Sequence, residues 1–243
     1  MTYPRRMPRP HLPAKVRAVT AVTDHMRQIE LVGPGLRSLR VRPGAHLVVR
    51  VPTGQGEARR VYSIWTFRPR EAALTIRVAI HDADGPGCVW ARSVVPGDRI
   101  TVEPPRSKIT LDETATSHLF IGEETGAVPL LAMRAALHPR VSVHGVFEAA
   151  GPGHEVPGAD GVPGLPWVHR GNAKAVGSRV LLRAVQELAL PSPAGAAAYV
   201  AGESDTCRLI QRHLIEQRGL SRRAVRIQPQ WSLGRAGFGA GSD

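Results

Sequence analysis

The first hundred residues carry short apolar runs in which hydrophobic positions alternate with polar or small ones. Residues 74–80 show the strictest alternation, with leucine, isoleucine or valine at every second position. A period of two is typical of a β-strand with one buried face. Similar runs occur at 16–22, 29–32, 47–51 and 61–65, and turn-forming glycines and prolines separate them at 33–35, 43–44, 53–56 and 96–98. Short strands at this close spacing predict a small antiparallel barrel, interrupted by one short helix over residues 88–94.

The pattern changes after about Asp112. Short apolar runs now alternate with longer segments of helical period, which indicates βαβ units and a parallel sheet. Strands are expected at 119–121, 141–146, 196–201 and 225–227, and helices at 128–137, 180–190 and 205–218. For the last helix, Ser204 is the expected N-cap and Gly219 the residue just past the C-terminal end. Residues 149–166 are expected to form a long surface loop, and the tail after Gly234 is expected to be disordered.

These patterns predict a two-domain β + α/β protein. We expect a flexible N-terminal arm over residues 1–13, an antiparallel β-barrel over 14–113 and a parallel-sheet α/β domain over 114–243. Ligands of a parallel sheet bind at the carboxyl ends of its strands. Those ends carry Gly-Glu-Glu-Thr at 122–125 and Gly-Glu-Ser at 202–204. Either segment alone suits an ordinary strand-to-helix turn, but two of them on neighbouring strands favour a ligand site.

The chain has 243 residues, a globular composition and a formal net charge of +12. A positive charge favours anionic partners, but the arginines are scattered and no nucleic-acid-binding motif is present. Cys88 and Cys207 lie far apart with no histidine at metal-ligand spacing, which argues against a disulfide framework and against a zinc site. The sequence has no apolar window of about 18 residues, and its beginning lacks the apolar segment of a signal peptide. We therefore expect no membrane insertion and a cytoplasmic location.

The segment Arg60-Val61-Tyr62-Ser63 lies on a predicted strand. It resembles the Arg-x-Tyr-Ser/Thr flavin signature of the ferredoxin–NADP reductase superfamily. There the arginine contacts the flavin pyrophosphate, the tyrosine stacks on the isoalloxazine ring and the hydroxyl lies near the reactive flavin nitrogen. Without that resemblance, Tyr62 suits a half-buried strand aromatic and Arg60 a surface charge.

A second motif follows one strand later, where His81 precedes Gly85-Pro86-Gly87-Cys88 and Trp90. A glycine-led turn that opens a helix presents backbone N–H groups and a favourable dipole to an anion. In the same superfamily such a turn holds the FAD pyrophosphate. Cys88 stands where a serine or alanine is common, and we interpret it as a small buried hydrophobe rather than a redox thiol.

The order of the motifs resembles the siderophore-interacting protein family, which comprises FAD-dependent ferric-siderophore reductases. His81, the turn at 85–90, Pro96-Gly97-Asp98, the strand ends at 122–125 and 200–203, and Trp231 follow one another as they do in that family. The resemblance implies FAD contacts from Arg60, Tyr62, Ser63, Ile64, Trp65, His81, Gly85, Pro86, Gly87, Cys88, Trp90 and Thr125. It implies NAD(P)H contacts from Gly122, Glu123, Thr125, Ala201, Gly202, Glu203, Ser204 and Trp231, and substrate contacts from Arg106, Lys108 and Arg235.

The function implied by the resemblance is the reduction of a ferric siderophore, with electrons from NAD(P)H or a ferredoxin. Ferrous iron binds hard oxygen ligands more weakly than ferric iron does, so reduction releases it. The flavin carries the chemistry, and neither a catalytic side chain nor a metal ligand is expected of the protein. Two alternatives stay open: a flavoprotein that supplies electrons to another protein, and a non-catalytic siderophore-binding protein. Trp65 departs from the family pattern, which often has arginine at that position.

An anionic siderophore would give the positive charge of the chain a role. A basic cleft raises the encounter rate with an anion. Arg106, Lys108, Arg170 and Lys174 all lie in expected loops, and we expect them to contribute to such a cleft.

Overall fold

The computed structural model describes residues 11–81, 85–190 and 192–235. Most of the expected N-terminal arm, residues 1–10, lies outside these ranges, and so does the expected disordered tail from residue 236 onward. The first strand, β1, begins at Leu12, so Leu12 and Pro13 belong to the barrel rather than to an arm. Leu12 pairs there with Val102.

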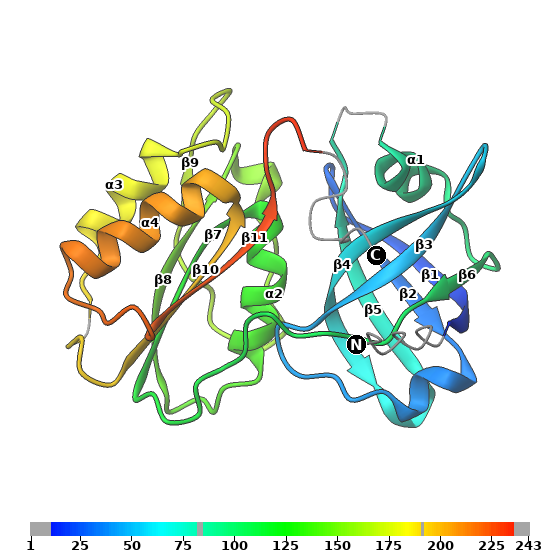
Figure 1. Cartoon of the computed structure of the whole chain (residues 1–243), viewed down its shortest axis with the longest axis horizontal. Helices are drawn as coiled ribbons and strands as arrows, with labels where there is room; N and C mark the ends of the chain where they lie inside the picture. The colour runs from blue at the N-terminus through cyan, green and yellow to red at the C-terminus, as the bar shows by residue number, and fades with distance from the viewer. Residues whose placement is uncertain (1–10, 82–84, 191, 236–243) are drawn as a thin grey trace, which may run out of the picture.

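The N-terminal half is a closed barrel of antiparallel strands, in the order β1-β2-β5-β4-β3-β6 (Figure 1). The strands are β1 (Leu12–Thr23), β2 (Met26–Val32), β3 (His46–Thr53), β4 (Gly56–Arg68), β5 (Ala73–Ala79) and β6 (Arg99–Val102). Short 3-10 helices occur at Pro34–Ser38 and Pro69–Glu71, and helix α1 (Pro86–Ser93) lies against one end of the barrel.

The alternation in the sequence places the barrel core. Leu47, Val49 and Val51 of β3 point into it, together with the apolar positions of β5. The sequence predicted a half-buried β5, but Thr75 and Arg77 on its other face are buried as well. The reason is that the α/β half covers this side of the barrel.

The C-terminal half is a five-stranded parallel sheet in the order β11-β10-β7-β8-β9. The elements are β7 (Ser117–Glu123), α2 (Glu124–Ala135), β8 (Ser142–Ala149), a 3-10 turn (Pro152–His154), β9 (Trp167–His169), α3 (Arg179–Glu187), β10 (Ala196–Glu203), α4 (Ser204–Glu216) and β11 (Val225–Trp231). Figure 1 shows α3 and α4 on one face of the sheet and α2 on the other, between the sheet and the barrel. This architecture confirms the predicted fold class.

The two halves share a hydrophobic cluster around α2. It joins Phe120 and Tyr199 of the sheet to Met26 and Trp65 of the barrel. The guanidinium carbon of Arg77 lies 3.5 Å from the centre of the Trp65 ring. Arg77 also donates to the carbonyl oxygen of Pro157 across the interface, at 2.6 Å. The domain boundary expected between residues 113 and 114 falls in the segment between β6 and β7 and stays a prediction.

Two helix starts differ from the sequence predictions. Helix α2 begins at Glu124 instead of Val128, because the Glu123 carboxylate caps it by accepting from the Thr125 amide. The prediction that Ser204 is the N-cap of α4 is wrong. Glu203 occupies that position and accepts from two backbone amides, which makes Ser204 the first helical residue. Within the described ranges, no helix combines the length and apolar character needed to cross a bilayer.

Candidate functional site

The barrel half of the candidate site forms where β4 meets the start of α1. A Cβ atom at Gly87 would lie 2.6 Å from the Tyr62 hydroxyl and 3.4 Å from the side-chain carbons of Arg60. Only a glycine therefore lets the helix approach these two side chains so closely. Among the described residues, the first turn of α1 has no side-chain cap and no acidic side chain. The stem of the Arg60 side chain thus packs against the start of α1, while its guanidinium donates to the carbonyl oxygen of Arg59 at 2.8 Å. A helix start next to an arginine suits an anion.

The hydroxyl group of Tyr62 could accept a ligand as its hydrogen-bond partner. Its hydroxyl is buried and has no hydrogen-bond partner among the described residues. Burial, followed by the nearby Cys88, raises the pKa of Tyr62 above its usual range. The Tyr62 and Trp90 rings stack with centroids 5.9 Å apart. A buried phenol without an acceptor costs free energy, and a phosphate or ribose oxygen of FAD would satisfy it. These residues therefore fit a flavin dinucleotide.

His81 and Cys88 lie in contact beside this turn. Their side-chain hydrogen bond raises the pKa of His81 and lowers the pKa of Cys88. Cys88 is buried, as interpreted from the sequence, but its thiol is also polarised by the imidazole. The Glu123 carboxylate also contributes to the raised pKa of His81. This electrostatic interaction joins the barrel half of the site to the α/β half.

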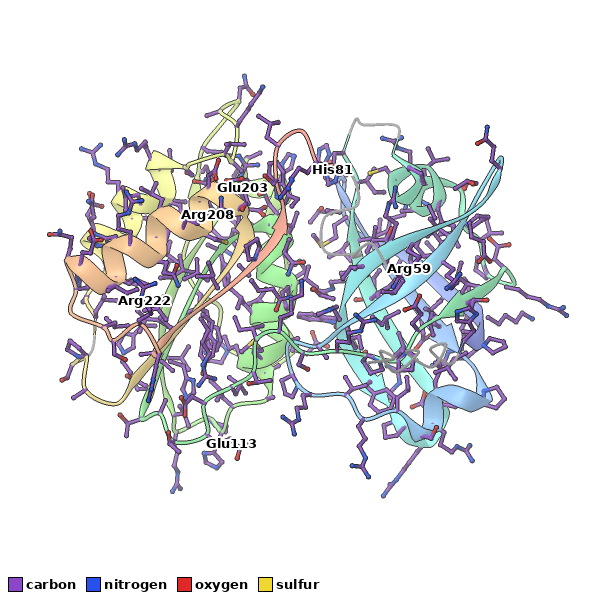
Figure 2. The ribbon with its side chains drawn as sticks, viewed as in Figure 1. Arg59, His81, Glu113, Glu203, Arg208 and Arg222 are labelled. Carbon is purple, nitrogen blue, oxygen red and sulfur yellow. The ribbon has the colours of Figure 1, made fainter. Side chains whose placement is uncertain are left out.

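The α/β half of the site lies at the carboxyl ends of β7 and β10. Glu123 accepts hydrogen bonds from the Thr125 amide at 2.9 Å, from the Thr125 hydroxyl and from Nε1 of Trp231 at 3.1 Å. Burial, and then the adjacent Glu124, raise the pKa of Glu123. Figure 2 shows His81 and Glu203 in the upper part of the view, on the two sides of the junction between the halves. The structure thus brings the strand-end residues and His81 to one region, although they are far apart in sequence.

The glycines at these strand ends have packing roles. A Cβ at Gly122 would lie 2.4 Å from the carbonyl oxygen of Ala201 on the neighbouring strand. Gly202 has a φ of 136°, and a Cβ there would lie 2.7 Å from a carboxylate oxygen of Glu123. Both glycines are therefore explained by contacts within the sheet, without a ligand.

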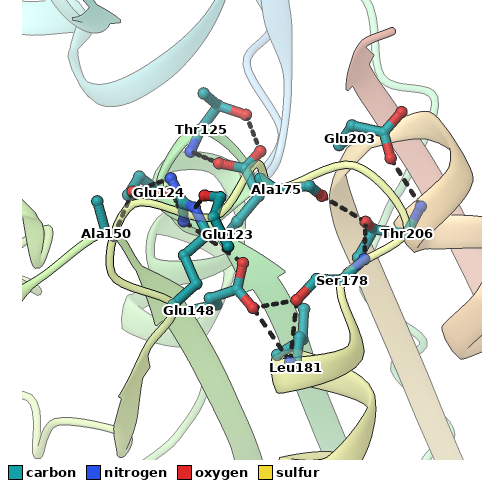
Figure 3. A network of polar contacts seen from close by, with 12 residues as sticks. Glu123, Glu124, Thr125, Glu148, Ala150, Ala175, Ser178, Leu181, Glu203 and Thr206 are labelled. Carbon is teal, nitrogen blue, oxygen red and sulfur yellow. Dashed lines mark hydrogen bonds and ion pairs between the residues drawn. The ribbon is translucent and has the colours of Figure 1, made fainter. Parts of the chain in front are cut away.

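Glu203 and Ser204 are both buried, at 0% and 1% exposure. Glu203 Oε2 accepts from the backbone amides of Asp205 at 2.9 Å and Gly177 at 3.3 Å. It also accepts from the amide of Thr206 at 2.8 Å (Figure 3). This carboxylate is thus part of the structure that holds the start of α4.

Several expected site residues lie elsewhere. Ile64 points into the barrel core, and Trp65 packs in the cluster between the two halves rather than with Tyr62. Ser63 is buried and lies opposite His46 in the strand register. Their roles in FAD binding stay predictions.

The expected basic residues are not equivalent. Arg170 is only 13% exposed and bonds to Glu124 at 2.8 Å, and it also lies 3.4 Å from Glu148, so its charge is used within the fold. Arg106 lies 3.7 Å from the buried carboxylate of Glu103 and is partly neutralised by it. Arg235 is exposed in the turn after β11. Substrate contacts from Arg106, Lys108 and Arg235 stay predictions.

Sequence reasoning missed Glu148 and His46. Glu148 lies near the carboxyl end of β8, as Glu123 and Glu203 end β7 and β10, and it accepts from the Ser178 hydroxyl and the Leu181 amide at the start of α3. The recurrence of glutamate at three strand ends was a signal in the sequence. His46 is buried at the start of β3, and no pattern around it marks this burial.

Comparison with known families agrees with this geometry. The family described as siderophore-interacting FAD-binding domain matches residues 44–109, and the family described as siderophore-interacting protein matches residues 115–234. The first match covers Arg60, Tyr62 and Gly87, and the second covers the three strand-end glutamates. The chain belongs to the siderophore-interacting protein family.

Solved structures share the fold over nearly the whole chain. A siderophore utilization protein from T. fusca is 28% identical, with a TM-score of 0.81 over 94% of this chain and 95% of that one. Phthalate dioxygenase reductase is 21% identical, with a TM-score of 0.68 over 90% of this chain and 68% of that one, which is a likeness of fold.

Curated relatives are more distant or much longer. The ferric vibriobactin reductase ViuB of Vibrio cholerae is 24% identical over 180 residues, which cover 72% of this chain and 65% of that protein. The mycobactin importer IrtA of Mycobacterium tuberculosis is 29% identical over 117 residues, which cover 45% of this chain and 14% of the importer. The chain thus spans less than two thirds of the length of either relative.

Proposed function

We propose that this protein is an FAD-dependent reductase that delivers electrons to a ferric siderophore and thereby releases ferrous iron. The observation that carries the proposal comes from the described part of the chain: the start of α1 beside Arg60 has no side-chain cap, and the buried Tyr62 hydroxyl has no hydrogen-bond partner. Together they suit the pyrophosphate of FAD. Membership of the siderophore-interacting family, and the vibriobactin reductase among its relatives, support a ferric siderophore as the electron acceptor.

In this proposal the chain's own residues bind and orient the cofactor. Arg60 and the α1 amides would hold the pyrophosphate, and Tyr62, whose ring stacks with Trp90, would offer its ring to the flavin. A bound flavin supplies the conversion between two-electron donors and one-electron acceptors. His81 and Thr125 line the region where the two halves meet. NAD(P)H or a ferredoxin supplies electrons, and we propose a cytoplasmic location.

The test is an anaerobic reduction series with the FAD-loaded protein. The protein is mixed in turn with NADH, NADPH and a reduced ferredoxin, and then with catecholate, hydroxamate and carboxylate ferric chelates. Bleaching of flavin absorbance reports the donor, and colour from a ferrous-specific chelator reports the acceptor. We expect at least one ferric siderophore to restore the oxidised flavin spectrum with release of ferrous iron. If reduced flavin persists with every ferric siderophore, the proposal is wrong.

The same series, extended with an oxidised ferredoxin as acceptor and with a siderophore-binding measurement on the flavin-free protein, distinguishes two other functions. Phthalate dioxygenase reductase, which has the same fold, transfers electrons from pyridine nucleotides to a [2Fe–2S] centre. A flavin that is reoxidised rapidly by an oxidised ferredoxin but by no ferric chelate would favour an electron-supply role. A protein that takes up no FAD yet binds ferric siderophore would favour a non-catalytic binding protein.

A further inference from the structure

Buried glutamate carboxylates bind the backbone amides at the helix N-termini of the α/β domain. Glu123 ends β7, Glu203 ends β10, and Glu148 lies one residue before the end of β8. Each accepts a hydrogen bond from a backbone amide in the first turn of α2, α4 or α3, respectively. This edge of a parallel sheet is where the fold class binds nucleotides, with pyrophosphate held by helix N-termini. The chain therefore uses its own anions where a dinucleotide's phosphates would bind.

Glu203 is the clearest example of a side-chain carboxylate in the place of a ligand phosphate. Its Oε2 accepts hydrogen bonds from the backbone amides of two segments, Asp205 and Thr206 of α4 and Gly177 of the turn before α3. A phosphate oxygen on this helix start would need the same donors. Because Glu203 is fully buried, a phosphate that approaches from solvent finds these donors already bonded.

The charge of Glu203 adds a repulsive contribution. Its other oxygen, Oε1, is buried and has no hydrogen-bond partner among the described residues. Glu123 lies against the adjacent Gly202 and brings a second carboxyl group to the same strand end. A phosphate brought against the Glu203 carboxylate in this desolvated site would meet a like charge, which disfavours binding strongly.

Helix α1 provides the contrast within the same molecule. Of the α-helices in the described ranges, α2, α3 and α4 have a side-chain cap at their N-termini, and α1 has none. Helix α1 begins beside Arg60, whereas α4 begins on a buried glutamate. The open helix start thus belongs to the barrel, and the closed ones belong to the sheet.

We propose that Glu203 is a specificity-determining residue that excludes the pyrophosphate of a pyridine dinucleotide from the start of α4. The inference rests on the reductase function proposed above and refines the class of its electron donor. A pyridine nucleotide is then held by its nicotinamide half, and its adenosine half contributes little to affinity.

The first test replaces Glu203 and measures binding of oxidised NADP⁺ and NAD⁺ by calorimetry. Glu203→Ser empties the position of the carboxylate, and Glu203→Gln removes its charge at nearly the same size. We expect NADP⁺ to bind about tenfold more tightly to Glu203→Ser, with a smaller gain for Glu203→Gln. Flavin content and far-UV circular dichroism report whether each variant folds, and Glu203→Gln carries the test if the shorter side chain prevents folding.

Asp205→Asn is the matched control. Asp205 lies in the same helical turn, is 60% exposed and pairs with Arg208, and it accepts from none of the amides at the start of α4 in the described structure. Its replacement removes one negative charge without freeing an amide, so affinity for NADP⁺ should not change. An equal gain in Asp205→Asn, or no gain in either Glu203 variant, would overturn the proposal.

The second test uses the unaltered protein and needs no variant. Nicotinamide mononucleotide lacks the pyrophosphate and the adenosine of NADP⁺. We expect the two dissociation constants to agree within about fivefold, and weak binding of both also supports the proposal. NADP⁺ binding that is more than about a hundredfold tighter would overturn it. These binding measurements do not depend on ferric-chelate reduction, so failure of the proposed function would be seen separately.

Discussion

At the scale of single residues, burial determines the protonation of His46. It begins β3, is 4% exposed and is held on both sides of its backbone by hydrogen bonds with Arg106 at 2.9 and 2.8 Å. Its Nδ1 has no partner among the described residues. Burial, and then the charge of Lys108, lower the pKa of His46 to about 4. The imidazole is therefore neutral in the fold at pH values where the unfolded chain would protonate it.

This depressed pKa predicts a contribution to acid sensitivity. Between about pH 6.5 and 4 the unfolded chain binds a proton that the folded chain does not, so the free energy of unfolding falls as pH drops through this window. The His46 contribution is on the order of 2–3 kcal/mol at the acid end. His46→Gln should flatten this part of the curve, measured by urea unfolding at a series of pH values. The exposed His138→Gln is the control, and an unchanged slope in His46→Gln would refute the assignment.

At the scale of elements, the barrel and the order of strands and helices could be predicted from the sequence because alternation and turn residues are local signals. The start of α2 could not, because its cap is a glutamate and glutamate is not a usual N-cap residue. The closing of the sheet edge by Glu123, Glu148 and Glu203 also escaped prediction. Each interaction joins segments that the fold brings together, such as Gly177 and Glu203.

The start of α1 carries the element-scale prediction. Gly87→Ala would place a methyl group 2.6 Å from the Tyr62 hydroxyl, so the helix, Tyr62 or both must shift. We expect the purified variant to retain less than about a tenth of the wild-type FAD after dialysis, since loss of one or two hydrogen bonds to a charged group lowers affinity at least tenfold. Gly54→Ala in the turn between β3 and β4 is the control, because a Cβ there has no atom within 4 Å. Equal flavin retention in both variants would contradict the proposed pyrophosphate site.

At the scale of the whole molecule, the contact between barrel and sheet explains features that neither half explains alone. β5 is buried on both faces because the second half covers it, which no local pattern indicates. Trp65, the departure from the family pattern, provides an aromatic face for Arg77. Arg77 in turn donates to Gln28 of the barrel at 3.1 Å and to Pro157 of the α/β half. The departure thus serves the orientation of the two halves, between which the proposed flavin site lies.

Arg77→Met tests this coupling. Methionine keeps much of the apolar stem but loses the cation over Trp65 and leaves the carbonyl oxygen of Pro157 without this donor. Burial lowers the pKa of Arg77 to about 10, so the side chain is still charged at neutral pH and the interaction is present there. We expect the free energy of unfolding to fall by roughly 1–3 kcal/mol, measured by urea unfolding.

Flavin fluorescence and far-UV circular dichroism should also cease to report one common transition in Arg77→Met, because the halves lose a shared contact. Arg183→Met is the control, since that side chain is 82% exposed on α3. If both variants unfold like the unaltered protein, Arg77 does not couple the halves and the orientation of the flavin site must depend on the apolar cluster around α2.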